Sequence, residues 1–144
     1  NWTTLSEKAK DYMEKYIYIF SGLFGLLTPK TPIPDYKLKM NVLSLQHHWN
    51  PILTDTLNDE DVIIDLLPQV HRKAYTPNKN SVIPVDFLIV SKGKKTAAGH
   101  FGKAVKGEFI RHMAENNITK TDEFSGFEYE GFKWDGTSFI KEEG

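Results

Sequence analysis

Apolar residues recur at helical spacing between residues 5 and 19, which predicts an amphipathic helix near the start of the chain. Thr4 and Glu7 stand three residues apart at its beginning, which is the spacing of a capping box. The stretch FSGLFGLLTP at residues 20–29 carries two glycines and is expected to end the helix. Three prolines between residues 29 and 34 then predict an extended loop, because proline lacks an N–H donor and restricts the residue before it.

The middle of the chain predicts short strands and helices in alternation. Apolar residues alternate with lysines over residues 36–40, a pattern typical of a half-buried strand. Asn50-Pro51 indicates the start of a short helix to about residue 57, since proline is favoured at the first helical position. Further apolar runs predict strands over residues 62–67 and 82–90, and Pro68 begins a helix through Tyr75.

The last third of the chain predicts a strand pair, a long helix and a hairpin. The stretch SKGKK forms the turn of the strand pair, and the returning strand begins at Thr96. A helix over residues 102–116, the connection NNIT and a short helix capped by Thr119 and Asp122 make a helix–hairpin–helix-like element. Asp135-Gly136 is a strong two-residue turn signal in the final hairpin. This order of elements predicts an α+β fold, with a mixed or antiparallel sheet and flanking helices.

The composition is that of a globular protein. The chain has 144 residues, of which 40% are hydrophobic and 26% charged, so we expect a single domain over residues 1–144. No run of eighteen apolar residues is present, which argues against a membrane partner. The absence of cysteine excludes disulfides and thiolate metal sites. Because the first residue is Asn rather than Met, we also expect the chain to be a fragment of a longer protein.

A net charge of −1 conceals one strongly basic segment. Between residues 91 and 112 six basic residues stand against a single acidic one, Glu108, which gives a local net charge of +5. Such a segment predicts a surface that attracts phosphate groups. The basic residues are Lys92, Lys94, Lys95, Lys103, Lys106 and Arg111.

The predicted helix over residues 102–116 carries part of this charge. Lys103 and Arg111 fall on the face opposite its apolar residues, whereas Lys106 falls beside the apolar stripe. Gly107 in the middle of a helix costs about 1 kcal/mol relative to alanine, and the usual reason is close approach of a backbone or a ligand. The helix therefore either faces phosphate, with Gly107 giving access, or is an ordinary amphipathic helix with solvated lysines. The SKGKK turn leaves the same two interpretations open.

Two further features have both a structural and a functional interpretation. Gly22 and Gly25, three residues apart, form either a clamp on a nucleic-acid backbone or, as we favour, a packing elbow. Asp65 interrupts an apolar run and needs a partner if it is buried. That partner could be a lysine of the basic segment, and an acid–base pair of Asp65 with Lys106 would make an active-site core. We favour the other interpretation, in which Asp65 belongs to a structural buried pair or meets solvent at a strand end.

No pattern of metal ligands or cofactor binding is present. The adjacent His47 and His48 point in different directions on a helix or a strand, and no H-x-x-x-H or H-E-x-x-H spacing occurs. The chain also lacks a G-x-S-x-G motif and a Walker-type glycine loop. We therefore predict no metal and no cofactor.

An ordered set of blocks resembles the YaaA-like peroxide-stress proteins over essentially all 144 residues. The blocks are SGLFGLLTP, DYKLKM, VIIDLL, PVDF, GKAVKGEFIRHMAENNIT and GFEYEGFKWD. The resemblance implies a bacterial, cytoplasmic protein that binds DNA through a helix–hairpin–helix element and limits iron-driven oxidative damage. Members of that family have a further N-terminal portion, so the resemblance implies that this chain is the C-terminal two-thirds of one.

Several positions match the family pattern and three regions depart from it. Thr28 stands where arginine is frequent, Lys39 where the pattern has glutamate, and DLLPQVH replaces a block that usually reads Asn-Leu-Ala-Ser-x-Glu-Tyr. Because the basic helix is better preserved than that polar block, we expect binding rather than turnover. The matching positions are Ser21, Gly22, Leu23, Gly25, Pro29, Tyr36, Leu38, Met40, Lys103, Lys106 (arginine in the family), Gly107, Arg111, Glu130, Gly131 and Phe132.

The leading hypothesis is a DNA-binding stress protein that contacts the backbone of double-stranded DNA with little sequence specificity. Its expected contacts are the six basic residues of the segment and Gly107. A second hypothesis is an enzyme acting on a nucleotide or a nucleic-acid base, and a third is a protein-interaction module with an exposed apolar patch. The sequence carries no signal for an oligomeric state. The residues expected to form or support a cleft are Ser21, Gly22, Gly25, Tyr36, Asp65 and Glu130, together with Lys106.

Overall fold

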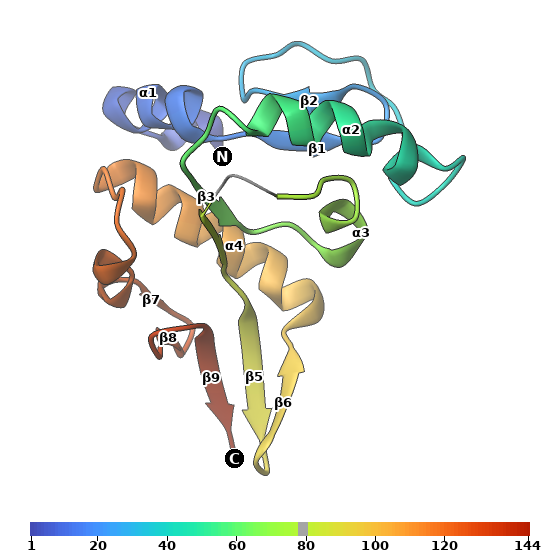
Figure 1. Ribbon diagram of the computed structural model, residues 1–144. Coiled ribbons are helices and arrows are strands. Elements are labelled where there is room, and N and C mark those ends of the chain that lie inside the picture. Colours follow the sequence, from blue (N-terminus) through green and yellow to red (C-terminus); the bar gives the residue numbers. More distant parts are fainter. Residues whose placement is uncertain (78–80) are drawn as a thin grey trace. The chain divides into compact units, whose positions relative to one another are not determined.

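The computed structural model describes residues 1–77 and 81–144 and has the predicted α+β composition (Figure 1). Its helices, of which the two η elements are 3-10 helices, are η1 (Trp2–Thr4), α1 (Glu7–Tyr16), α2 (Leu45–Leu57), α3 (Gln69–Arg72), α4 (Gly99–Glu115) and η2 (Thr121–Gly126). Its strands are β1 (Ile19–Ser21), β2 (Gly25–Leu27), β3 (Val62–Asp65), β4 (Ser81–Pro84), β5 (Phe87–Ser91), β6 (Lys94–Ala97), β7 (Glu128–Tyr129), β8 (Phe132–Trp134) and β9 (Phe139–Glu143).

The chain divides into two compact units. The first unit contains residues 1–15 and 85–144, and the second contains residues 16–84. The basic segment therefore belongs wholly to the first unit, whereas the glycine pair and Asp65 belong to the second.

The first unit is built on a five-stranded mixed sheet in the order β6-β5-β9-β8-β7. β5 and β9 are parallel, and the other neighbours pair antiparallel. α4 lies across one face of this sheet (Figure 1) and buries Val105, Phe109 and Met113 there. These are the three residues that helical spacing places on one side of the helix, so the predicted apolar face of α4 is confirmed.

α4 ends in a turn in which Asn117 takes the left-handed conformation that asparagine tolerates. The φ of Asn117 is 49°. The Ile118 N–H bonds the Met113 carbonyl at 2.9 Å, and the Asn117 N–H bonds the Ala114 carbonyl at 3.4 Å. This is the hydrogen-bond pattern of a Schellman motif, in which asparagine replaces the more usual glycine. The turn directs the chain from α4 into η2.

The second unit has two small ladders and one core cluster. β1 and β2 pair antiparallel, and β3 and β4 pair in parallel. Met40, Leu53, Leu57, Ala74 and Tyr75 form the buried cluster, which partly buried side chains of β1, β2 and α2 complete.

The predicted start of the first helix needs a correction. The Ser6 Oγ accepts the N–H of Ala9 at 3.2 Å, so Ser6 caps α1. The expected cap, Thr4, belongs to η1, and its hydroxyl donates instead to the Asn1 carbonyl at 3.0 Å. Residue 19 is not helical either, because it begins β1.

Two predicted elements of the second unit are wrong at their boundaries or in kind. Residues 36–40 form no strand, because no neighbouring strand pairs with them; Met40 nevertheless enters the core. α2 begins at Leu45 rather than at Asn50, and Pro51 lies inside it. The packing of Leu45 and Trp49 against the core cluster accounts for the longer helix despite the missing proline N–H.

The predicted strand over residues 82–90 is two strands. β4 ends at Pro84 and pairs with β3 in the second unit, while β5 begins at Phe87 and pairs with β6 and β9 in the first. One apolar run thus serves two separate cores, which periodicity does not reveal.

The hairpin turns are of two kinds. Lys92 and Gly93, with φ of 50° and 76°, join Ser91 to Lys94 in a tight two-residue turn. A turn was predicted in this lysine-rich stretch, but the returning strand begins at Lys94 rather than at Thr96. In the final hairpin the two-residue turn is at Glu130-Gly131 and not, as predicted, at Asp135-Gly136. Residues 135–138 make a longer connection in which the Asp135 carboxylate accepts the backbone N–H groups of Thr137 and Ser138.

Hydrogen bonds tie α1 to α4 within the first unit. The Glu115 carboxylate accepts the Ser6 N–H at 3.0 Å and the Ser6 hydroxyl at 2.6 Å. The Tyr12 hydroxyl donates to the Ile118 carbonyl at 2.5 Å. The side-chain and then the backbone hydrogen bond from Ser6 hold the pKa of Glu115 below its usual value.

We predict that Glu115 contributes to stability in a pH-dependent way. Because its pKa is lower in the folded state, its contribution is present above the unfolded-state pKa and is lost as the pH falls through the folded-state pKa. Glu115→Gln should therefore lower the thermal midpoint at pH 7 and leave it nearly unchanged under acid conditions. The exposed Glu142→Gln serves as the matched control. Equal thermal midpoints for wild type and Glu115→Gln at pH 7 would contradict the assignment.

Candidate functional site

The lysines of the strand pair gather at one end of the sheet of the first unit. Lys92 lies in the β5–β6 turn, and Lys94 and Lys95 are the first residues of β6. All three are exposed, and β6 is an edge strand whose four residues are all exposed. Successive side chains of a strand point to opposite faces, so Lys94 and Lys95 extend to either side of this edge. Edge lysines also discourage pairing with strands of other chains.

α4 presents further basic groups in the same unit. Lys103 is exposed, and Lys106 is half-buried beside the apolar face, as its position on the helix predicts. A half-buried lysine places its aliphatic stem along apolar surface and its ammonium group at the edge. Only Ala98 separates β6 from α4, so the strand and helix lysines are carried by one continuous segment.

Arg111 has an intramolecular role that the sequence did not reveal. Its Nη1 donates to the Thr4 hydroxyl at 2.7 Å, and its Nη2 donates to the Thr4 carbonyl at 2.8 Å. The guanidinium group thus ties α4 to η1. Because two of its five N–H donors are already used, Arg111 is less available to a phosphate than the exposed lysines are.

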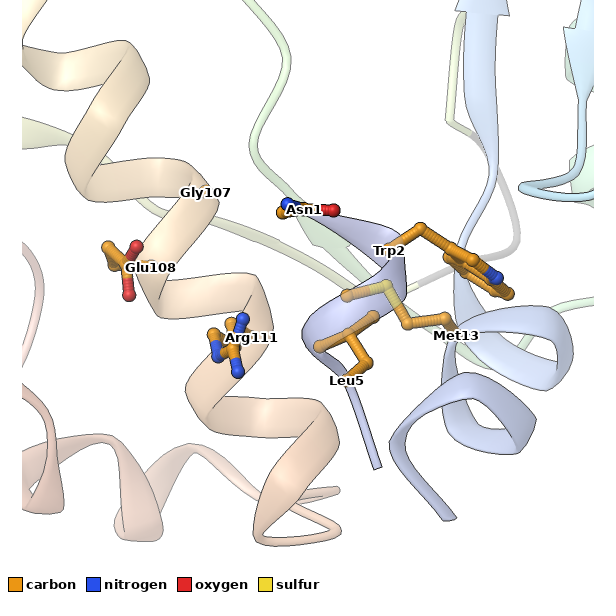
Figure 2. A pocket seen from close by; sticks show the side chains of 7 residues that line it. All are labelled: Asn1, Trp2, Leu5, Met13, Gly107, Glu108 and Arg111. Atoms are coloured by element: carbon orange, nitrogen blue, oxygen red, sulfur yellow. The ribbon is translucent and has the colours of Figure 1, made fainter. Parts of the chain in front are cut away.

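A shallow recess of about 220 Å³ lies between α4 and η1 (Figure 2). A Cβ atom built on Gly107 would meet no other atom within 4 Å. The expectation that another backbone approaches Gly107 is therefore wrong for the part of the chain that the structure describes. Glu108 places a carboxylate on the same recess, which opposes the binding of an anion there. The lining residues are Asn1, Trp2, Leu5, Met13, Gly107, Glu108 and Arg111.

In the second unit, Ser21 and Tyr36 are in contact. Ser21 is buried, and its hydroxyl oxygen forms a hydrogen bond with the Tyr36 hydroxyl. The same oxygen accepts the Phe24 N–H at 3.1 Å. Both expected cleft residues are thus engaged with each other and with the local backbone.

Close packing requires glycine at positions 22 and 25. A Cβ on Gly22 would lie 2.7 Å from the Leu38 carbonyl oxygen. Gly25 has a φ of 78°, and a Cβ there would lie 2.5 Å from the Trp49 ring. The Trp49 indole N–H in turn donates to the Gly22 carbonyl at 2.9 Å. This geometry gives each glycine a packing role, in keeping with the elbow interpretation.

Asp65 is buried at the end of β3, and it has hydrogen-bond partners within its own unit. Its carboxylate accepts the Arg72 Nε at 3.0 Å, the Tyr75 hydroxyl at 3.1 Å and the Leu67 N–H at 2.8 Å. The ion pair of Asp65 is with Arg72, which agrees with the structural buried pair favoured from the sequence; Lys106, the partner in the active-site hypothesis, belongs to the other unit. The nearby helix α3 brings this arginine back to the strand end within seven residues.

Burial, and secondarily the charge of Asp65, raises the pKa of Tyr75 to about 12. The phenol is therefore neutral near pH 7 and acts as a hydrogen-bond donor to Asp65. The Asp65 carboxylate, which accepts hydrogen bonds from Leu67, Arg72 and Tyr75, holds the α3 region against the end of β3.

Glu130, the remaining residue expected in the cleft, belongs to the first unit together with Lys106. It is exposed in the β7–β8 turn with a φ of 50°. Ser21 and Asp65 belong to the second unit and lie in two different hydrogen-bonded clusters there. Sequence reasoning did not identify Arg72, Tyr75 and Trp49, the residues that hold these clusters.

Clusters of metal ligands and membrane-spanning helices are both missing from the described residues. Among the described residues no group of three or more histidine and carboxylate side chains is arranged to hold a metal ion. Over the same residues, no helix has the length and apolar character needed to cross a bilayer.

We predict that Asp65→Asn destabilises the second unit by about 2–4 kcal/mol, because it removes the buried carboxylate charge that pairs with Arg72 and accepts the Tyr75 hydroxyl. Urea unfolding followed by tryptophan fluorescence measures the change. The exposed Asp55→Asn on α2 should change the unfolding free energy by no more than about 0.5 kcal/mol. If Asp65→Asn changes the unfolding free energy as little as this control does, the buried Asp65–Arg72 pair is not important for stability.

Comparison with known proteins agrees with the ordered blocks of the sequence. A family model described as peroxide stress protein YaaA matches residues 1–138, which include most of the first unit and all of the second. The chain therefore belongs to the peroxide stress protein YaaA family.

Proposed function

We propose that this chain serves the peroxide stress response by binding the backbone of double-stranded DNA. The contact surface, called here the lysine surface, consists of Lys92, Lys94, Lys95, Lys103 and Lys106. Family membership supports the role in oxidative stress. The binding of DNA is inferred from the distribution of charge.

The observation that carries the proposal is the concentration of lysines on one short segment of the first unit. Four of the five are exposed, and the fifth is half-buried. β6 spans about 10 Å from Lys94 to Ala97, given a rise of about 3.3 Å per residue in a strand, and α4 begins two residues later. Since duplex DNA carries one charge per about 1.7 Å of its axis, a surface of this extent can meet several phosphates.

The chemistry of the lysine surface favours binding without sequence selection. Ammonium groups on flexible side chains contact phosphate oxygens as point charges and do not read base edges. Exposed Lys120, at the N-cap of η2, adds a charge at the connection between α4 and η2. In a helix–hairpin–helix contact, the backbone of such a connection faces phosphate, so residues 116–120 are included in the proposed interface.

A catalytic function is not proposed. Asp65 is held by Arg72, Tyr75 and the Leu67 N–H, and Ser21 is held by Tyr36 and the Phe24 N–H. Neither cluster presents a nucleophile beside a general base.

We predict that Lys94→Ala combined with Lys103→Ala weakens binding to duplex DNA to a similar extent for all sequences. Loss of two phosphate contacts should reduce the slope of log affinity against log salt by about two. Titration of labelled duplexes at several salt concentrations measures both quantities.

The matched control removes the same charge from the second unit, with Lys37→Ala and Lys73→Ala, both exposed lysines. This control should retain the wild-type salt slope. The proposal is wrong if the control loses as much affinity as the first variant, or if the first variant binds as the wild type does.

A further inference from the structure

The three methionines differ in how accessible their sulfur atoms are, and all three lie in the described part of the chain. Met40 is 1% exposed in the core of the second unit. Met113 is 3% exposed and lies on the buried face of α4. Met13, on α1, is half-buried and lines the recess between α4 and η1. In Figure 2 the Met13 thioether lies beside Trp2 and Leu5 on the η1 side of that recess.

We propose that Met13 is the site at which hydrogen peroxide oxidises this protein. The thioether sulfur donates an electron pair to one peroxide oxygen, the O–O bond breaks, and the products are methionine sulfoxide and one molecule of water. The sulfur is oxidised by two electrons, and the peroxide is reduced by two. This inference does not depend on DNA binding, because it rests on the recess and on the burial of the other two methionines.

No thiol competes for the peroxide, since the chain contains no cysteine. Oxidation of methionine depends on access of the oxidant to the sulfur. The recess is open to solvent and has a volume of about 220 Å³, which is ample for a molecule of two oxygen atoms. By contrast, peroxide reaches Met40 and Met113 only when their cores open.

Oxidation of Met13 has a structural consequence. A sulfoxide is polar and accepts hydrogen bonds, so it is disfavoured in a recess that Leu5 and Trp2 also line. The η1 segment is otherwise held to α4 by the two bonds between Arg111 and Thr4. Loss of this apolar packing loosens residues 1–4 and weakens the hold of Thr4 on the Arg111 guanidinium group, while Ser6 stays bonded to Glu115.

The first test is peptide mapping of the full chain by mass spectrometry after timed exposure to hydrogen peroxide. Met13 sulfoxide should form about tenfold faster, or more, than sulfoxide at Met40 or Met113. In concentrated urea the three rates should converge, because unfolding exposes all three sulfurs. Equal rates in the folded protein, or faster oxidation at either buried methionine, would overturn the proposal.

The second test follows the consequence by hydrogen exchange. Peroxide should raise the amide exchange of residues 2–4 in the wild type, and treatment with methionine sulfoxide reductases should reverse the change. Met13→Leu keeps an apolar side chain of similar volume, so it should fold normally and show no such increase. An equal increase in Met13→Leu would overturn the assignment to Met13, and no increase in oxidised wild type would overturn the proposed loosening of η1.

Discussion

The packing of Phe109 against the sheet is the contact on which the first unit depends. This α4 side chain is fully buried, and its ring centroid lies 4.9 Å from that of Phe139, 5.1 Å from Phe124, 5.3 Å from Phe127 and 6.0 Å from Phe87. Each such aromatic pair adds about 0.5–1.5 kcal/mol to the burial of apolar area. Because these rings are supplied by β5, β9 and the η2 region, one side chain fixes both the position and the rotation of α4.

The rotation of α4 about its axis determines which of its side chains face solvent and which reach the N-terminal segment. With Val105, Phe109 and Met113 directed inward, Lys103 faces solvent, and Arg111 and Glu115 reach the N-terminal segment. The helix therefore joins three roles, since it covers the sheet, holds η1 and α1, and carries part of the lysine surface. The second unit has a different organisation, in which the buried Asp65–Arg72 pair and the glycine contacts of Trp49 hold short elements together. The exposed basic residues of the segment thus lie in the first unit, and Ser21 and Asp65 of the second unit make contacts within that unit.

Sequence patterns predicted the features that depend on residues close together in the chain, such as the buried face of a helix. The inward face of α4 follows from helical spacing, and a turn in the lysine-rich stretch was predicted, although the sequence did not show that only Lys92 and Gly93 form it. The expected strand over residues 36–40 failed because a strand needs a partner, which alternation alone does not supply. The partners of Asp65 and Arg111 were missed for a similar reason, since Arg72 and Thr4 reach them only through the fold. Family membership was predictable because it rests on the order of blocks along the chain.

The central claim is that the basic segment of the first unit meets the DNA backbone. The most direct measurement is a titration of isotope-labelled protein with a short duplex, followed by the chemical shifts of the backbone amides. The account predicts that the largest changes fall at residues 92–95, 103–107 and 116–120, and that added salt reverses them. Changes centred on residues 16–84, or no change at all at low salt, would contradict it.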